Sequence, residues 1–204
     1  MNKGELRTHF LALLNRSDCT DALADTFIDQ AIGRIRRTLR IPSMERQQTY
    51  AVSSAGGLQS IVLPSDLLET MDLYYDGDAL VRLPLHEMLA NQKTGELGSP
   101  RFFTREHGTF RIFPMPTTGT IYLNYYAELS NLVEDSDSNS FSVVASDALI
   151  YTALGYASDY FLDERGPLFD SKASVFLAEV QDQSDTEEQS GGTQVMRPTH
   201  TFSD

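Results

Sequence analysis

Metal chemistry is the first possibility that the residue types raise, and their spacing argues against it. The four histidines lie far apart, and none has a second ligand at helical spacing; they are His9, His86, His107 and His200. Cys19 is the only cysteine, so an intramolecular disulfide is impossible and a thiolate metal site is disfavoured. Asp76-Gly77-Asp78 and Asp135-Ser136-Asp137 resemble fragments of calcium loops, but acidic turns are usually solvated. We therefore expect no metal and no other cofactor.

Catalytic motifs are also missing from the sequence. Gly56-Gly57 and Gly191-Gly192 lack the lysine, the spacing and the strand-to-helix setting of a phosphate-binding loop. No serine lies in a nucleophile elbow, whose sharp turn exposes the hydroxyl for attack. With no nucleophile, base or electrophile brought together by spacing, we expect that the protein is not an enzyme.

Four arginines, Arg34, Arg36, Arg37 and Arg40, form the one concentrated set of side chains with binding chemistry. They could be a solvated or ion-paired surface, a protein interface or a DNA contact. A DNA contact would need more basic neighbours than the local sequence supplies. Because arginine is enriched at protein interfaces, we assign these four residues to a contact with another protein subunit.

The element that must position these arginines is a helix with its second half at residues 27–42. Apolar residues recur at spacings of three and four, which places them on one side of a helix with the arginines on the other; they are Ala24, Phe27, Ile28, Ala31, Ile32, Ile35 and Leu39. Thr20 or Asp21 can cap its start, and Pro42 makes continuation past Ile41 unfavourable.

Composition and charge limit the possible classes of protein. The chain has 204 residues, enough for one ordinary core plus extensions, and no apolar run approaches the roughly 20 residues that span a bilayer. The N-terminus lacks the pattern of a signal peptide, so we expect synthesis in the cytoplasm and no membrane partner. The net charge of the whole chain is −13, and most of it comes from residues 134–204, which carry 14 acidic and three basic residues. Such a surface repels nucleic acid, which disfavours binding by phosphate neutralisation.

Helix patterns at both ends of the chain bracket a region of short strands, which predicts an α+β protein. Residues 5–15 form a short first helix, and residues 143–162 and 168–183 form two more. Residues 48–53 with 58–63, 67–75 with 79–83, and 101–113 suggest three hairpins, and residues 120–126 a further strand. Five or six strands of this kind predict a small antiparallel sandwich or open barrel. Residues 85–91 could form a short helix.

The last 21 residues, 184–204, have few apolar side chains and two adjacent glycines, so we expect a flexible tail. A few anchors near its end could dock on a partner. They are Val195, Met196, Arg197 and Phe202. A solvated terminus with no role is the alternative.

Taken in order, four segments resemble the head-to-tail adaptor proteins of tailed bacteriophages, the head-completion family that binds the portal. They are FIDQAIGRIRRTLRIPSMERQQTYAV, LPSDLLETMDLYYDGDALVRL, GSPRFFTREHGTFRIFPMPTTGTIYLNYYAEL and SDALIYTALGYASDYFLDERGPLFDSKASVFLAEV. The resemblance covers roughly residues 5–182 and contains no catalytic motif.

The resemblance implies a helical bundle from both ends of the chain with an inserted small antiparallel β domain. We accordingly expect a bundle of residues 1–42 and 143–183, a β domain of 43–142 and a tail of 184–204. It further implies a homo-oligomeric ring in the virion, of twelve copies, with the portal protein above and a tail nozzle or tail-tube protein below. DNA would pass through the channel without specific binding.

Two other functions stay open at this point. One is a gatekeeper or tail-tube-attached component of the same particle, which would bind tail protein instead of portal. The other is a β-sandwich module that binds carbohydrate or another ligand through an aromatic platform. Its candidate residues are Tyr74, Tyr75, Tyr122, Tyr125 and Tyr126.

Overall fold

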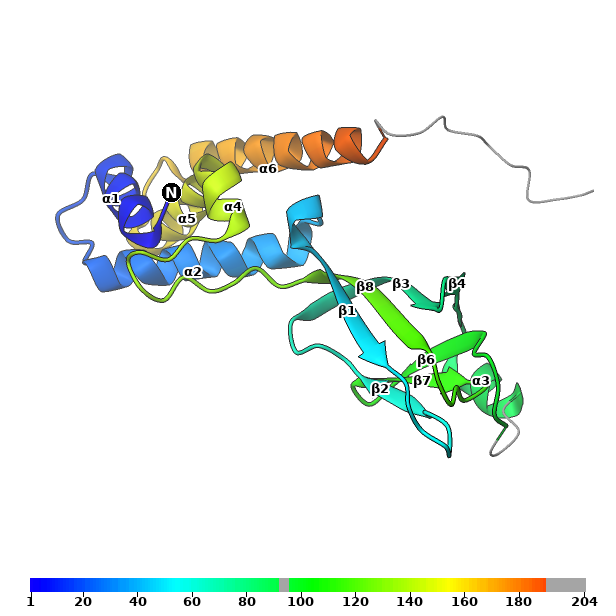
Figure 1. The fold of residues 1–204 in the computed structure, drawn as a ribbon. Helices are drawn as coiled ribbons and strands as arrows, with labels where there is room; N and C mark the ends of the chain where they lie inside the picture. Colours follow the sequence, from blue (N-terminus) through cyan, green and yellow to red (C-terminus); the bar gives the residue numbers. More distant parts are fainter. Residues whose placement is uncertain (92–95, 190–204) are drawn as a thin grey trace, which may run out of the picture. The chain divides into compact units, whose positions relative to one another are not determined.

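The computed structural model describes residues 1–91 and 96–189, and these form two compact units (Figure 1). Residues 1–43 and the chain from Leu129 onward make a helical unit, and Met44–Glu128 make a β unit inserted between them. Helices from both ends of the chain with antiparallel sheets between them confirm the α+β class. The helical unit begins again at residue 129, which is 14 residues before the predicted boundary.

Five helices make up the described part of the helical unit: α1 (Lys3–Leu14), α2 (Asp21–Thr38), α4 (Ser140–Val144), α5 (Ser146–Phe161) and α6 (Gly166–Gln189). Helices α1, α2 and α4 each begin at an N-cap residue. The side chains of these residues, Asn2, Thr20 and Asn139, each accept a hydrogen bond from a backbone N–H of the first turn. The predicted apolar face of α2 is confirmed, since its members from Ala24 to Ile35 are all buried.

Helix α5 is the centre of this unit, and α1, α2 and α6 all pack on it. It is buried on most sides and uses small residues for close approach. A Cβ added at Gly155 would lie 2.8 Å from Asp170 Oδ1 of α6, so glycine permits this contact. Aromatic rings fill the wider spaces, with Phe27 of α2 against Tyr160 and Phe161.

The C-terminal helices differ from the predicted ones at their ends. The predicted helix 143–162 is two helices that meet at Ala145, because Asn139 and Ser142 cap each other reciprocally and start α4 earlier. Helix α6 continues to Gln189, so residues 184–189 do not belong to a flexible tail. Those residues contain no glycine or proline, and Gln183 donates to Glu187 one turn on, a spacing that supports a helix. The rest of the predicted tail lies outside the described residues.

In the described part of the β unit, eight strands form two four-stranded sheets. One sheet has the order β1 (Glu45–Ala51), β8 (Thr120–Ala127), β3 (Leu67–Tyr75) and β4 (Asp78–Ala79). The other has the order β2 (Ser60–Val62), β7 (Thr109–Phe113), β6 (Phe102–Glu106) and β5 (Val81–Arg82). Between β5 and β6 runs α3 (Leu85–Asn91), and a short 3-10 helix, η1 (Pro42–Met44), precedes β1.

The two sheets enclose one core, as expected of a sandwich. Strand β8 alternates strictly, with Ile121, Leu123 and Tyr125 buried and Tyr122 and Tyr126 half-buried on the other face. The core includes residues of both sheets, and within it the rings of Phe103 and Phe110 meet edge to face with centroids 5.0 Å apart.

The hairpin predicted at residues 101–113 is confirmed, because β6 and β7 pair around His107-Gly108. The hairpin predicted for residues 67–75 with 79–83 is confirmed only at its turn, where β3 and β4 pair around Asp76-Gly77, both with positive φ. Val81–Arg82 is instead β5 of the other sheet and runs parallel to β6. The hairpin around residues 55–57 is wrong, because β1 pairs with β8 and β2 pairs with β7 of the other sheet. Gly57 is needed for another reason. Its φ is +80°, and a Cβ added there would lie 2.6 Å from Leu97 Cδ2, so glycine permits both the backbone conformation and the close contact.

Candidate functional site

The four predicted arginines are largely engaged within the helical unit. Arg34, Arg36 and Arg37 lie in α2, whereas Arg40 follows it, because the helix ends at Thr38 and not at Ile41 as predicted. Arg34 lies 3.6 Å from Asp170 of α6 (Nη1 to Oδ1), and Arg36 donates to the carbonyl of Leu129 and to Asn131 Oδ1. Arg40 donates from Nη1 to the carbonyls of Arg36 and Leu39, at 3.0 and 2.7 Å. Three of the four arginines therefore bind groups of their own subunit.

Arg37 differs from the other three. Its side chain is exposed, and it takes part in no hydrogen bond or ion pair among the described residues. It lies one turn beyond Gly33, and a Cβ added at Gly33 would lie 3.8 Å from Arg37 Nη1. A role of these arginines at a subunit interface stays a prediction, and Arg37 is the member best placed to test it.

A separate ion network, which the sequence pattern did not reveal, fastens α1 to the rest of the unit. Arg7 holds Asp25 of α2 with two hydrogen bonds of 2.6 and 2.8 Å and also reaches Asp135 at 2.7 Å. Lys3 lies 3.2 Å from Asp25 and donates to the carbonyl of Val133. All these partners are distant in the sequence, so only the folded chain brings them together.

The electrostatics of this network follow from its partial burial. Burial on its own raises the pKa of Asp25, but hydrogen bonds from Arg7 and Lys3 outweigh it, and the pKa is lowered overall. The hydrogen bonds to Asp25 and Asp135 raise the pKa of Arg7. Both groups are therefore charged at neutral pH, and the network acts as a structural clamp.

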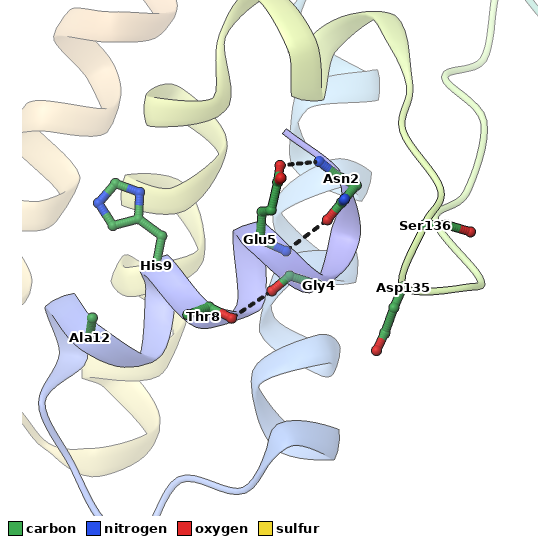
Figure 2. A pocket seen from close by; sticks show the side chains of 8 residues that line it. All are labelled: Asn2, Gly4, Glu5, Thr8, His9, Ala12, Asp135 and Ser136. Atoms are coloured by element: carbon green, nitrogen blue, oxygen red, sulfur yellow. Dashed lines mark hydrogen bonds between the residues drawn. The ribbon is translucent and has the colours of Figure 1, made fainter.

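A hollow of 630 Å³ lies on the outer face of α1 (Figure 2). It is lined by Asn2, Gly4, Glu5, Thr8, His9, Ala12, Asp135 and Ser136. Figure 2 shows Asn2 and Glu5 bonded to each other in a capping box and Thr8 bonded to the carbonyl of Gly4. Most of these polar groups are used in local hydrogen bonds, and His9 makes none with the residues that the structure describes.

A second hollow, of 200 Å³, lies where α6 passes α4 and η1. Its walls are mostly apolar, and the sequence pattern gave no sign of it, because it depends on how far α6 extends. The predicted docking residues Val195, Met196, Arg197 and Phe202 lie outside the described residues.

The remaining candidate residues behave as structural groups. Cys19 is buried, burial raises the pKa of its thiol, and no described base accompanies it. Within residues 1–91 and 96–189, no group of three or more histidine, cysteine or acidic side chains is arranged to hold a metal ion. No described helix is long and apolar enough to cross a membrane.

The aromatic platform does not form as a single surface. Tyr125 is buried in the core and donates to Asp66, and Tyr75 packs against the same core while donating to the carbonyl of Thr118. Tyr122 and Tyr126 lie on the opposite face of β8. Tyr74 of β3 pairs with Tyr122 across the ladder. Alternation therefore divides the five tyrosines between two faces, and they do not form the single platform that the carbohydrate-binding alternative requires.

Comparison with known proteins supports an assembly role. A search among curated proteins finds no match. Among solved structures, one described as the neck of an empty GTA particle computed with C6 symmetry is similar over 78% of this chain and 80% of that chain, at 15% identity and a TM-score of 0.27. The family model for the SU10 adaptor protein matches residues 1–201. Since this match spans nearly the whole sequence, the chain belongs to the SU10 adaptor protein family and is a structural head-to-tail adaptor of a phage virion.

Proposed function

We propose that copies of this protein form a ring at the head-to-tail junction that binds the portal on one side and a tail nozzle or tail-tube protein on the other. The observation that carries the proposal is the family match over residues 1–201. A two-unit subunit suits this role, since each unit has its own core and can present its own surface to a partner.

The proposed ring has twelve copies and surrounds the exit channel for DNA. An acidic chain suits such a channel, because its negative charge repels the phosphate groups of the DNA and so disfavours binding to the channel wall. No described residue cluster supports catalysis, and an adaptor acts by holding its neighbours, so the proposed role is structural throughout.

Cryo-electron microscopy of the protein mixed with its candidate portal tests the proposal. We expect a ring seated on the portal and, without portal, a monomer or small oligomer by size-exclusion chromatography. Binding to tail protein alone would favour the gatekeeper or tail-tube-attached alternative. A stable ring without portal would show that the portal does not template assembly.

Arg37 is proposed to contact an acidic surface of the neighbouring subunit. The change Arg37→Glu should prevent ring assembly on the portal and leave the monomer folded, because the side chain is exposed and makes no described intramolecular bond. Thr26→Glu adds an acid on another exposed position of α2 and serves as the matched control. Normal rings from Arg37→Glu would remove this residue from the interface.

The C-terminal segment is proposed to order on the portal by coupled folding and binding. Truncation after Gln189, where α6 ends, removes Val195, Met196, Arg197 and Phe202 and leaves the described helices intact. We expect loss of portal binding at concentrations that saturate the full chain. Unchanged binding would assign portal contact to another surface.

A further inference from the structure

The groove beside the end of α6 is an interaction surface with a specific shape. It is lined by Ile41, Pro42, Ser43, Val144, Val180, Gln183, Ser184 and Glu187, all within the helical unit. Val144 stands at its edge with 65% of its surface exposed. A volume of 200 Å³ is below the roughly 300–1,000 Å³ of small-molecule sites, so it suits one or two side chains of a peptide.

The groove exists because α6 is longer than the helix it packs on. Helix α6 has 24 residues and α5 has 16, which correspond to about 36 and 24 Å. The two run antiparallel, with Gly155 beside Asp170 and Tyr151 against Phe176. The last two turns of α6 therefore extend past the start of α5, where the half-buried Val180 lines the groove with Val144 of α4.

Ser184 adds a polar group to this surface. The residue lines the groove and has only 8% of its surface exposed. An extended peptide in the groove would offer backbone groups to its hydroxyl.

The chain itself carries a segment that fits. Fifteen residues follow Gln189, beginning with Ser190-Gly191-Gly192, and glycine allows the sharp reversal needed to return along α6. At about 3.3 Å per extended residue, Val195 and Met196 come back by about 10 Å. At about 1.5 Å per helical residue, that distance reaches the level of Ser184 and Gln183.

Charge favours the same occupant. Arg197 follows Met196 directly, and the exposed side of the last turns of α6 carries Asp182, Asp185 and Glu187. A returning segment thus places two apolar side chains at the apolar groove and a cation beside the acidic turns. The groove and the segment match in sequence position, in length and in charge.

We propose that Val195 and Met196 dock in this groove of their own subunit before assembly, so that the portal must compete with the groove for the tail. The inference builds on the proposed portal-docking role of the tail and adds where the tail is held in the free subunit. A Val-Met pair held in the groove would be withheld from other partners until the portal displaces it.

Cysteine cross-linking of the full-length chain tests the contact. The pair Val144→Cys with Met196→Cys should form an intramolecular disulfide at least tenfold faster than the control pair Val175→Cys with Met196→Cys. Val175 is 52% exposed on α6 but lies outside the groove, so it controls for random encounters of the tail. Cys19 is buried and stays unchanged in both proteins. Equal rates, or a mainly dimeric product that shows docking on a second copy, would overturn the proposal.

Portal binding separates this inference from the proposed function. Val144→Asp should release the tail and tighten binding to purified portal by about 3–10-fold, since it removes a competing state. Weaker or unchanged binding would overturn the groove as the competing site. If truncation after Gln189 leaves portal binding intact while the Val144–Met196 disulfide still forms, the portal-docking role fails and the groove contact stands.

Discussion

The helical unit is closed by residues from opposite ends of the sequence, whereas both sheets of the β unit are built within Glu45–Ala127. The amine of Met1 donates to the carbonyl of Ser142 at 2.7 Å, and Arg165 donates to the carbonyl of Leu14 at 2.8 Å. In the β unit, stability comes chiefly from ladders and an apolar core shared by two sheets. Both units therefore have apolar cores, and the helical unit adds charged contacts between segments that are distant in the sequence.

Ile35→Asp should have the largest effect and should be confined to the helical unit. Ile35 is fully buried, and an unpaired carboxylate there should cost a large part of the free energy of unfolding, which is roughly 5–15 kcal/mol for native proteins. Hydrogen exchange resolved by peptide should show loss of protection in residues 1–43 and 129–189 and retention in the β unit. Arg37→Asp, on the exposed side of the same helix, is the control. Equal loss in both units would show that they fold as one.

Phe110→Ala is the corresponding change in the β unit. Phe110 is fully buried against Phe103, so truncation should destabilise this unit by about 3–5 kcal/mol. Denaturant unfolding followed by exchange in residues 60–62 and 102–113 measures the effect. Retained protection in α5 would confirm that the two cores are separate.

Asp25→Ala tests the charged clamp. It leaves Arg7 and Lys3 without their shared partner in a partly buried site, and we expect a loss of about 2–3 kcal/mol, less than for a fully buried pair. Asp18→Ala removes an exposed pair with Arg16 and should change stability by less than about 1 kcal/mol. Equal effects of the two changes on thermal unfolding would mean that the network contributes no more than a surface pair.

Acid should weaken the helical unit first. The pKa of Asp25 is lowered, and hydrogen bonds from Arg165 lower that of Asp163 to about 2. A lowered folded-state pKa gives stability that is present above the ordinary value of 3.8 and is lost as the pH falls through the folded value. Burial raises the pKa of Asp29, which opposes this trend in part. Ellipticity at 222 nm between pH 5 and 2 should fall before protection in the β sheets does.

Raising the pH should have the smallest effect, and it should destabilise the β unit before the helical unit. Burial raises the pKa of Tyr50, Tyr75 and Tyr125 above 10, with Asp76 and Asp66 adding to the last two. A raised folded-state pKa gives stability that is present below pH 10 and is lost as the pH rises through the folded value. In the part of the helical unit that the structure describes, Cys19 is the one neutral acid whose pKa is raised by burial in the same way. Above pH 10 the β unit should therefore lose protection first.

Much of this fold could be predicted from local patterns. The buried face of α2, its start at Thr20, the turns at Asp76-Gly77 and His107-Gly108, and helix α3 all follow from residue spacing and turn chemistry. The hairpin around Gly56-Gly57 could not be judged this way, because the choice of strand partner depends on residues far along the chain. Strand β1 finds β8 about 70 residues later.

The candidate site shows the same limit more strongly. Arg34, Arg36, Arg37 and Arg40 are equivalent in the sequence pattern, but the fold separates them, because only three of them face Asp170, Leu129, Asn131 or nearby carbonyls. The clamp of Arg7 and Asp25 and the groove at Ser184 left no local signal, since each is made by elements distant in the sequence.

The sequence by itself determined the helices, most turns, the α+β class and the acidic charge, because these depend on spacing, capping and composition. Only the tertiary structure decided which arginine stays exposed, which distant strands pair with β1 and β2, and where α6 leaves a groove. Those outcomes depend on which distant residues meet, and the entropy of bringing them together is repaid by burial and hydrogen bonds that no local pattern records.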